Sequence, residues 1–351
     1  MSDELAEEKR HGRVKCVVWD LDHTLWDGVL LEDGAVTVKP EVVAAIHALD
    51  GLGILHSIAS KNDHDAAWAQ VEQAGLAEMF LFPQIGWNAK SHSVQQIAKK
   101  LNIGLDALAF VDDQEFERAE VAAACPQVIG VDPAGLAAAL ETAEFRPRFV
   151  TEESRQRRAM YRSQISRDDE EENFVGTGEE FLAQLGLVVR IESAARDDLQ
   201  RAEELTVRTN QLNSTGRTYS YDELDKLRGS DDHLLYVVTL DDRFGSYGKI
   251  GLVLIERTSA AVWHLRLLLM SCRVLSRGVG TIVLNHLLRQ ARDAGVALHA
   301  DLIETGRNRM MQIAYAFAGF REIDRDGSHV TLRADLGEIP PVPPYVRLLT
   351  D

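Results

Sequence analysis

Short apolar runs alternate with helix-like segments along the first third of the chain. A run such as Val-Lys-Cys-Val-Val-Trp at 14–19 is typical of a buried strand, whereas apolar residues three and four positions apart predict helices. The expected strands are 14–19, 55–59, 79–82 and 107–111, and the expected helices are 40–52, 64–74 and 91–101. Because strands and helices alternate, this part of the chain predicts an α/β fold with a doubly wound parallel sheet.

The pattern changes after Asp132. Residues 151–173 are dense in arginine and glutamate and predict a charged helical segment. Further along the chain, the expected strands are 187–191, 234–240, 250–256, 261–270, 296–303 and 329–333, and the expected helices are 278–294 and 310–318. We therefore expect two domains, at 1–146 and 186–351, joined by a charged helical connector at 147–185.

The composition narrows the possible partners and the compartment. The net charge of −17, from 38 basic and 55 acidic residues, disfavours binding to nucleic acid. No apolar run is long enough for a membrane span, so we expect no membrane association. The three cysteines lie far apart in the sequence, which indicates free thiols and a cytoplasmic location.

Acidic residues follow two of the expected strands. Asp20 and Asp22 come after 14–19, and Asp112 and Asp113 follow 107–111. Ligands of doubly wound sheets bind at the carboxyl ends of strands, so these carboxylates can face one pocket. One can attack phosphorus, a second can protonate the leaving oxygen, and Mg²⁺ suits their combined charge. Each aspartate taken alone is equally typical of a helix cap or a turn.

Two further residues extend this arrangement. Ser60, at the end of an expected strand, can donate a hydrogen bond to a phosphoryl oxygen, and Lys90 can neutralise an intermediate. The order of the motifs is Asp20-x-Asp22-x-Thr24, Ser60, Lys90 and Asp112-Asp113. This order resembles the four motifs of the haloacid dehalogenase (HAD) superfamily.

The HAD resemblance implies a role for each residue. Asp20 would be the nucleophile and Asp22 the acid and base. Mg²⁺ would be held by the carboxylates of Asp20 and Asp112 and the backbone carbonyl of Asp22, with Asp113 sharing or replacing the role of Asp112. Two more residues are expected to contact the substrate, namely Thr24 and Lys61. The short spacing between motifs leaves no room for a large cap domain.

The second half carries a different arrangement. Residues 263–273 read as a strand that runs into a turn with Gly278 and Gly280 and then into a long helix. A strand, a glycine-containing turn and a helix N-terminus are typical of pyrophosphate binding. Together with the later Asn308, this half resembles the GNAT acyltransferase fold, an α+β fold. Leu275 departs from the GNAT pattern, which usually has a polar or basic residue there.

Cys272 lies where the expected strand ends. A thiol beside Arg273 and near a helix N-terminus is expected to have a lowered pKa, so Cys272 is a candidate acyl acceptor that forms a thioester. His299, on the next expected strand, is its candidate base. The alternative for both residues is ordinary core packing.

Several polar residues are candidates for binding a hydroxylated acid in this half, although turn chemistry explains them equally well. They are Asn210, Gln211, Asn213, Arg243, Arg273 and Arg277.

The whole chain resembles the FkbH-like proteins, HAD subfamily IIIC enzymes of polyketide biosynthesis with a GNAT-like C-terminal domain. The resemblance is carried by residues 19–30, 111–118, 208–213 and 270–274. His23 departs from it, since the family commonly has Asn there. The resemblance implies that the protein dephosphorylates 1,3-bisphosphoglycerate and loads the glyceryl group, through Cys272, onto the phosphopantetheine thiol of an acyl carrier protein.

Other functions are compatible with the same residues. The chain can be a capless Mg²⁺-dependent phosphatase fused to an acyl-CoA-dependent N-acyltransferase, or its second domain can be a docking module for a carrier protein. Because acyl carrier proteins are usually acidic, docking needs a local basic patch. Its candidate residues are Arg273, Arg277, Arg289 and Arg292.

Overall fold

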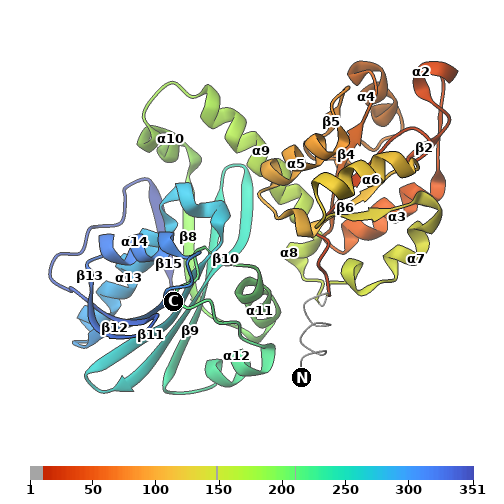
Figure 1. The fold of residues 1–351 in the computed structure, drawn as a ribbon. Coiled ribbons are helices and arrows are strands. Elements are labelled where there is room, and N and C mark those ends of the chain that lie inside the picture. The colour runs from red at the N-terminus through yellow and green to blue at the C-terminus, as the bar shows by residue number, and fades with distance from the viewer. Residues whose placement is uncertain (1–10, 148, 210) are drawn as a thin grey trace. The chain divides into compact units, whose positions relative to one another are not determined.

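The computed structural model describes residues 11–147, 149–209 and 211–351, apart from the side chains of Arg208 and Cys272. The chain divides into two compact units, Met1–Gln164 (unit 1) and Ile165–Asp351 (unit 2), and Figure 1 labels most of their elements. No described helix is both long enough and apolar enough to cross a membrane.

Unit 1 is built on a parallel sheet, which confirms the expected α/β class. Its strands are β1 (Cys16–Trp19), β4 (Leu55–Ser60), β5 (Gln84–Ile85), β6 (Leu108–Val111) and β7 (Ile129–Val131). The order across the sheet is β5-β4-β1-β6-β7, and every neighbouring pair is parallel. The central strand β1 is buried along its whole length, as its apolar sequence requires.

The helices of unit 1 follow the strands. They are α3 (Pro40–Gly51), α4 (His64–Gln73), α5 (Lys90–Leu101), α6 (Glu115–Ala124) and α7 (Leu136–Leu140). Asp63 caps α4 by accepting a hydrogen bond from the amide of Ala66. Between β1 and α3 the chain forms only β2 (Trp26–Asp27), α2 (Leu30–Asp33) and β3 (Thr37–Val38), so the described residues of unit 1 include no large cap.

The strand expected at 79–82 is wrong. Met79 ends a 3₁₀ turn, η1 (Ala77–Met79), and Phe80 makes only an isolated bridge to His56. These apolar residues are buried in the core without belonging to a ladder. Phe82, at a φ of 53°, leaves the extended conformation, and the strand forms later as β5.

Unit 2 contains one mixed sheet. Its strands are β8 (Leu187–Ser193), β9 (His233–Asp242), β10 (Gly245–Ser259), β11 (Val262–Met270), β12 (Ala297–Ile303), β13 (Phe320–Asp326), β14 (His329–Ala334) and β15 (Val346–Thr350). Their order is β13-β14-β12-β11-β10-β9-β8-β15. Helices α13 (Val279–Asp293) and α14 (Arg309–Phe317) share one core with the sheet, and α11 (Leu199–Arg208) and α12 (Tyr221–Arg228) share another.

Strands β11 and β12 separate partway along their length. They pair in parallel only from Val262 with Ala297 to Leu265 with Ala300. Beyond that point Ser214 takes the place of a neighbouring strand, because its amide donates to Leu268 and its carbonyl accepts from Ile303, each at 2.9 Å. The gap between the two strands is therefore filled by the chain itself.

The charged segment between the sheets forms helices α8 (Glu152–Arg155), α9 (Arg157–Asn173) and α10 (Gly178–Leu185). Within unit 1, Arg158 of α9 binds both oxygens of Asp50, at 2.8 and 3.1 Å. Within unit 2, Arg167 of α9 binds both oxygens of Asp242, at 2.7 and 2.8 Å, and both of these side chains are buried. The charges of α9 are therefore used in specific ion pairs.

Candidate active site

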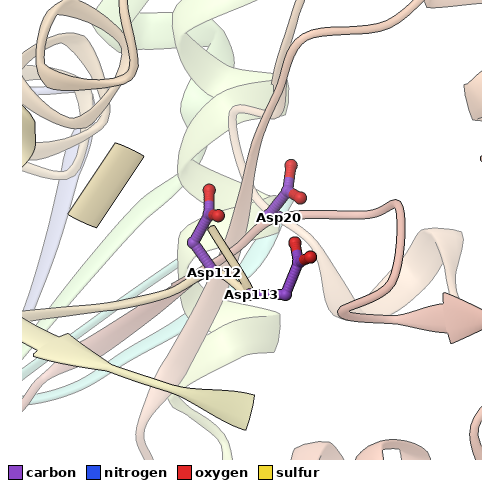
Figure 2. A group of neighbouring side chains, drawn as sticks. All are labelled: Asp20, Asp112 and Asp113. Atoms are coloured by element: carbon purple, nitrogen blue, oxygen red, sulfur yellow. The ribbon is translucent and has the colours of Figure 1, made fainter. Parts of the chain in front are cut away.

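Three carboxylates meet at the carboxyl edge of the unit 1 sheet. Asp20 follows β1, and Asp112 and Asp113 follow β6, the strand that pairs directly with β1. One oxygen from each lies within 4.8 Å of the others, and Figure 2 shows the three groups gathered together. Asp20 and Asp112 are buried, whereas Asp113 is partly exposed.

Lys90 neutralises part of this charge. Its ammonium group, at the start of α5, donates to Asp20 Oδ1 and to Asp112 Oδ2, the latter at 3.0 Å. Lys90 is itself buried, so these contacts are poorly screened by water. Burial raises the pKa of Asp20 to about 6, although Lys90 acts in the opposite direction.

The cluster retains capacity for a cation. Asp113 Oδ1 is buried and has no hydrogen-bond partner among the described residues. One lysine cannot balance three carboxylates, and an unpartnered buried carboxylate oxygen is costly. A hard divalent ion with oxygen ligands, such as Mg²⁺, fits the residues present.

The side chain of Asp22 lies apart from this cluster. Its Oδ1 accepts hydrogen bonds from Trp26 Nε1 at 2.7 Å and from the Leu30 amide at 3.1 Å. Its Oδ2 accepts one from Asn62 Nδ2 at 3.0 Å. Asp22 is therefore held in a fixed orientation, and only its backbone carbonyl is left as a possible metal ligand.

Thr24 does not face a substrate, contrary to expectation. Its side chain is fully buried, and its hydroxyl accepts a hydrogen bond from the Asp113 amide at 3.1 Å. Thr24 therefore ties the loop after β1 to the loop after β6. Ser60 is buried at the end of β4, as the strand pattern predicts. Lys61 forms an ion pair with Glu117 at 2.6 Å.

Trp26 and Asn62 are site residues that the sequence reasoning missed. Both are buried and both donate to Asp22. The available signal was position, since Asn62 follows Ser60 and Lys61, and Trp26 lies two residues after the first motif, within segment 19–30 that carries the family resemblance.

The structure places His299 far from Cys272, so the expectation that it serves as the base is wrong. His299 pairs with His264, eight residues before Cys272 along β11 and the turn that follows. At about 3.3 Å per residue, the backbones of His264 and Cys272 are on the order of 25 Å apart, and His299 lies beside His264. The rings of His299 and His264 meet edge to face, with centroids 6.0 Å apart. The side chain of Cys272 and the whole of Asn210 lie outside the described residues.

Asn213 holds the segment that fills the gap between β11 and β12, and it does not face a substrate. It is fully buried, and its Oδ1 accepts hydrogen bonds from the amides of Thr215 and Gly216 at 3.1 and 2.8 Å. Its backbone carbonyl accepts from Asn308 Nδ2 at 3.1 Å. Gln211, in contrast, is exposed.

The arginines expected to bind substrate in unit 2 are engaged in structural contacts. Arg243 forms an ion pair with Glu170 of α9. Arg277 is buried and binds Glu171 of the same helix at 2.8 Å. Arg273 donates to the Tyr247 carbonyl at 3.2 Å. None of the three is therefore a free cation, and Arg277 cannot form part of an exposed docking patch.

Other arginines suggested for docking also have partners. Arg289 donates to the Pro340 carbonyl, and Arg292 lies 3.6 Å from Asp293.

Neither protein-family models nor curated proteins gave a match to this chain. Solved structures resemble parts of it. The N-terminal part of a Bacteroides fragilis protein, containing a phosphatase domain complexed with Mg, is 26% identical over 41% of this chain and 43% of that chain, with a TM-score of 0.37. This chain therefore spans less than half of that protein.

Two N-acetyltransferase structures illustrate the other group of matches. PaiA from Thermoplasma acidophilum, in complex with coenzyme A, is 15% identical over 42% of this chain and 98% of that chain, with a TM-score of 0.35. The GNAT domain of PAT from S. lividans is 18% identical over 41% of this chain and 88% of that chain, with a TM-score of 0.33. These TM-scores are low, and the matches carry no information about the chemistry of the site.

The strand orders define the fold class. Unit 1 is a parallel α/β unit, and its described residues include no large cap. Unit 2 is an α+β unit, in which a mixed sheet separates two pairs of helices.

Proposed function

We propose that the protein releases phosphate from 1,3-bisphosphoglycerate and transfers the glyceryl group, through a thioester on Cys272, to the phosphopantetheine thiol of an acyl carrier protein. The observation that carries the phosphatase half is the convergence of Asp20, Asp112 and Asp113 beside Lys90. The transferase half is supported by the GNAT-like sheet and by the position of Cys272 between β11 and α13.

The residues of unit 1 divide the phosphatase chemistry between them. Asp20, buried at the end of β1, is placed to attack phosphorus and to form an aspartyl phosphate. Asp22 gives a proton to the leaving oxygen and then takes one from the attacking water. Lys90 offsets the charge that develops at Asp20. Mg²⁺, held by Asp20, Asp112 and Asp113, would screen the carboxylates from the phosphoryl group.

The transferase step needs no nucleotide, because the acyl phosphate of the substrate is already activated. The thiolate of Cys272 attacks the acyl carbon, the C–O bond to phosphate breaks, and phosphate leaves with its electron pair. The pantetheine thiolate then attacks the resulting thioester and releases the Cys272 thiolate.

The proposal is tested by incubating the protein with 1,3-bisphosphoglycerate, Mg²⁺ and a holo acyl carrier protein, and then measuring intact masses. We expect a glyceryl adduct on the carrier protein. Cys272→Ala should abolish the adduct on the enzyme, and Asp20→Asn should stop phosphate-ester hydrolysis. Absence of any adduct on either protein rejects the proposal.

The second candidate function is a phosphatase fused to an acyl-CoA-dependent N-acyltransferase, which the GNAT-like fold of unit 2 favours. Acyl transfer from acyl-CoA to an amine that survives Cys272→Ala would establish it in place of carrier loading.

A further inference from the structure

The large apolar side chains exposed in unit 1 are gathered at one edge of its sheet. Among the described residues they are Leu31, Trp87 and Phe116, with 53%, 70% and 74% of their surfaces exposed. Leu31 lies between β1 and α3, Trp87 between β5 and α5, and Phe116 in the first turn of α6. All three therefore follow the carboxyl ends of strands. We call Leu31, Trp87 and Phe116 the apolar collar.

The apolar collar lies on the approach to the carboxylate cluster. Trp87 precedes Lys90 by three residues, and Phe116 follows Asp113 by three. The start of α5 is held to the middle of α6, since both the amide and the hydroxyl of Ser91 donate to Glu120. Asp20 and Asp112 are buried and Asp113 is partly exposed, so the rest of a bound phosphate ester extends from the cluster at this carboxyl edge of the sheet, where the collar residues also lie. Exposed apolar groups beside a polar site indicate a ligand surface.

The spacing of the strands sets the size of this surface. Trp87 follows β5 and Phe116 follows β6, and two strands, β4 and β1, lie between them. Three strand spacings amount to about 14 Å. A three-carbon ester with its phosphate at the carboxylates is too short to contact both aromatic rings, whereas a substrate with a long tail can reach them.

The charges near the collar disfavour a second anionic group on the substrate. The lysine and arginine side chains in segments 20–39, 61–63, 86–90 and 112–118 are Lys39, Lys61, Lys90 and Arg118. Each is in an ion pair. Lys39 lies 3.6 Å from Asp27, and Lys61 lies 2.6 Å from Glu117. Lys90 lies 3.0 Å from Asp112, and Arg118 lies 2.9 Å from Asp132. These segments therefore offer no unpaired lysine or arginine for the second phosphate of a free bisphosphate, and an uncharged tail suits them better.

We propose that the apolar collar binds the pantetheine arm of a carrier protein, so that unit 1 dephosphorylates a phosphoglyceryl group already attached to that arm as a thioester. This inference rests on the proposed function and specifies the order of its steps, with acyl transfer before hydrolysis of the phosphate ester. Asp20 attacks phosphorus, the ester P–O bond breaks, and the C3 oxygen takes a proton from Asp22. Water then cleaves the aspartyl phosphate, which gives inorganic phosphate and restores Asp20, while Asp22 regains its proton.

The test compares three substrates that differ only in the tail. They are free 3-phosphoglycerate, its N-acetylcysteamine thioester and its pantetheine thioester. We expect kcat/KM for phosphate release to be at least tenfold higher for the pantetheine thioester than for the free acid, mainly through KM. The double variant Trp87→Ala/Phe116→Ala should lose most of this preference. Phe317→Ala, which removes an 87% exposed aromatic ring from α14 of unit 2, is the matched control and should retain it.

A binding measurement provides a readout that is independent of turnover. In an Asp20→Asn background, calorimetry should show tighter binding of the pantetheine thioester than of the free acid, and the collar variant should remove the difference. Equal kcat/KM for all three substrates, or a preference that survives in the double variant, overturns the collar inference while the proposed function stands. Failure to release phosphate from any of the three substrates, together with no acyl transfer, rejects the proposed function itself.

Discussion

At the scale of single residues, the aspartates of the candidate site are distinguished by the hydrogen bonds they receive. Asp22 accepts three hydrogen bonds from neutral donors, whereas Asp113 Oδ1 has no partner among the described residues. The hydrogen bonds to Asp22 fix its side chain for proton transfer, whereas the unpartnered oxygen of Asp113 is left for a cation. The sequence indicates which residues are acidic but not which donors reach them, since Trp26 and Asn62 gave no chemical signal of their own.

Trp26→Phe tests the role of the donors to Asp22. The substitution keeps an aromatic ring in the core but removes the indole N–H that binds Asp22 Oδ1. We expect kcat for phosphate release to fall about tenfold with little change in KM, because a misplaced acid weakens proton transfer and not substrate binding. Trp68→Phe is the matched control, since the Trp68 indole N–H donates to the carboxylate of Glu72 on the same helix, α4, and not to Asp22. Equal kcat values for the two variants would show that the donor to Asp22 has no positioning role.

At the scale of elements, periodicity predicted the three middle strands of the unit 1 sheet and six of the eight strands of the unit 2 sheet, whereas β7, α6 and α7 were not predicted. Strand β1, helix α5 and helix α13 lie close to the expected ranges because their apolar positions follow one period throughout. The strand expected at 79–82 failed because its apolar residues are buried in a turn, and burial alone does not distinguish a turn from a strand. The filling of the gap between β11 and β12 could not be predicted, because it depends on hydrogen bonds between residues far apart in the sequence.

Asn308 closes this gap from the α14 side. It is fully buried, and its Nδ2 lies at 2.8 Å from the Ile303 carbonyl and at 3.1 Å from the Asn213 carbonyl. We expect Asn308→Ala to lower the free energy of unfolding of unit 2 by about 2–3 kcal/mol, because buried carbonyls lose their donor. Denaturant unfolding measures the change. Asn173→Ala, which removes an exposed side-chain hydrogen bond at the end of α9, should change stability by less than about 0.5 kcal/mol. A loss in Asn308→Ala no larger than in that control would contradict this role.

At the scale of the whole molecule, the chain has two units, each with its own core. Alternating strands and helices predicted the parallel sheet of unit 1, and the changed order after it predicted the α+β unit. The positions of the arginines in α9, in the β9–β10 turn and in the turn before α13 did not reveal that they bind acids of the same unit, because ion pairing depends on the folded geometry.

Acid should destabilise unit 1 through His56. His56 is buried in unit 1, where Trp19 Nε1 donates to its Nδ1 at 3.1 Å, and burial lowers its pKa to about 4. The unfolded chain has a histidine pKa near 6.5 and therefore binds a proton first as the pH falls. From pH 7 to pH 5 the unfolding free energy of unit 1 should decrease by about 2 kcal/mol through this residue.

Unfolding of the wild type and of His56→Asn at both pH values isolates this contribution, because every other titrating group is the same in the two proteins. The Asn variant keeps an acceptor for Trp19 but no ring to protonate, so its decrease should be smaller by about 2 kcal/mol. An equal decrease in the two proteins would mean that His56 is not the titrating group.

The central claim is that Asp20, Asp112 and Asp113 hold one divalent ion required for phosphate release. Calorimetric titration of the chelator-treated protein with Mg²⁺, followed by a phosphate-release assay on the same sample, tests it most directly. We predict one ion bound per chain, no phosphate release before Mg²⁺ is added, recovery of release as the ion binds, and loss of both in Asp112→Asn. Full phosphate release in the chelated protein, or unchanged Mg²⁺ binding by the Asp112→Asn variant, would contradict the account.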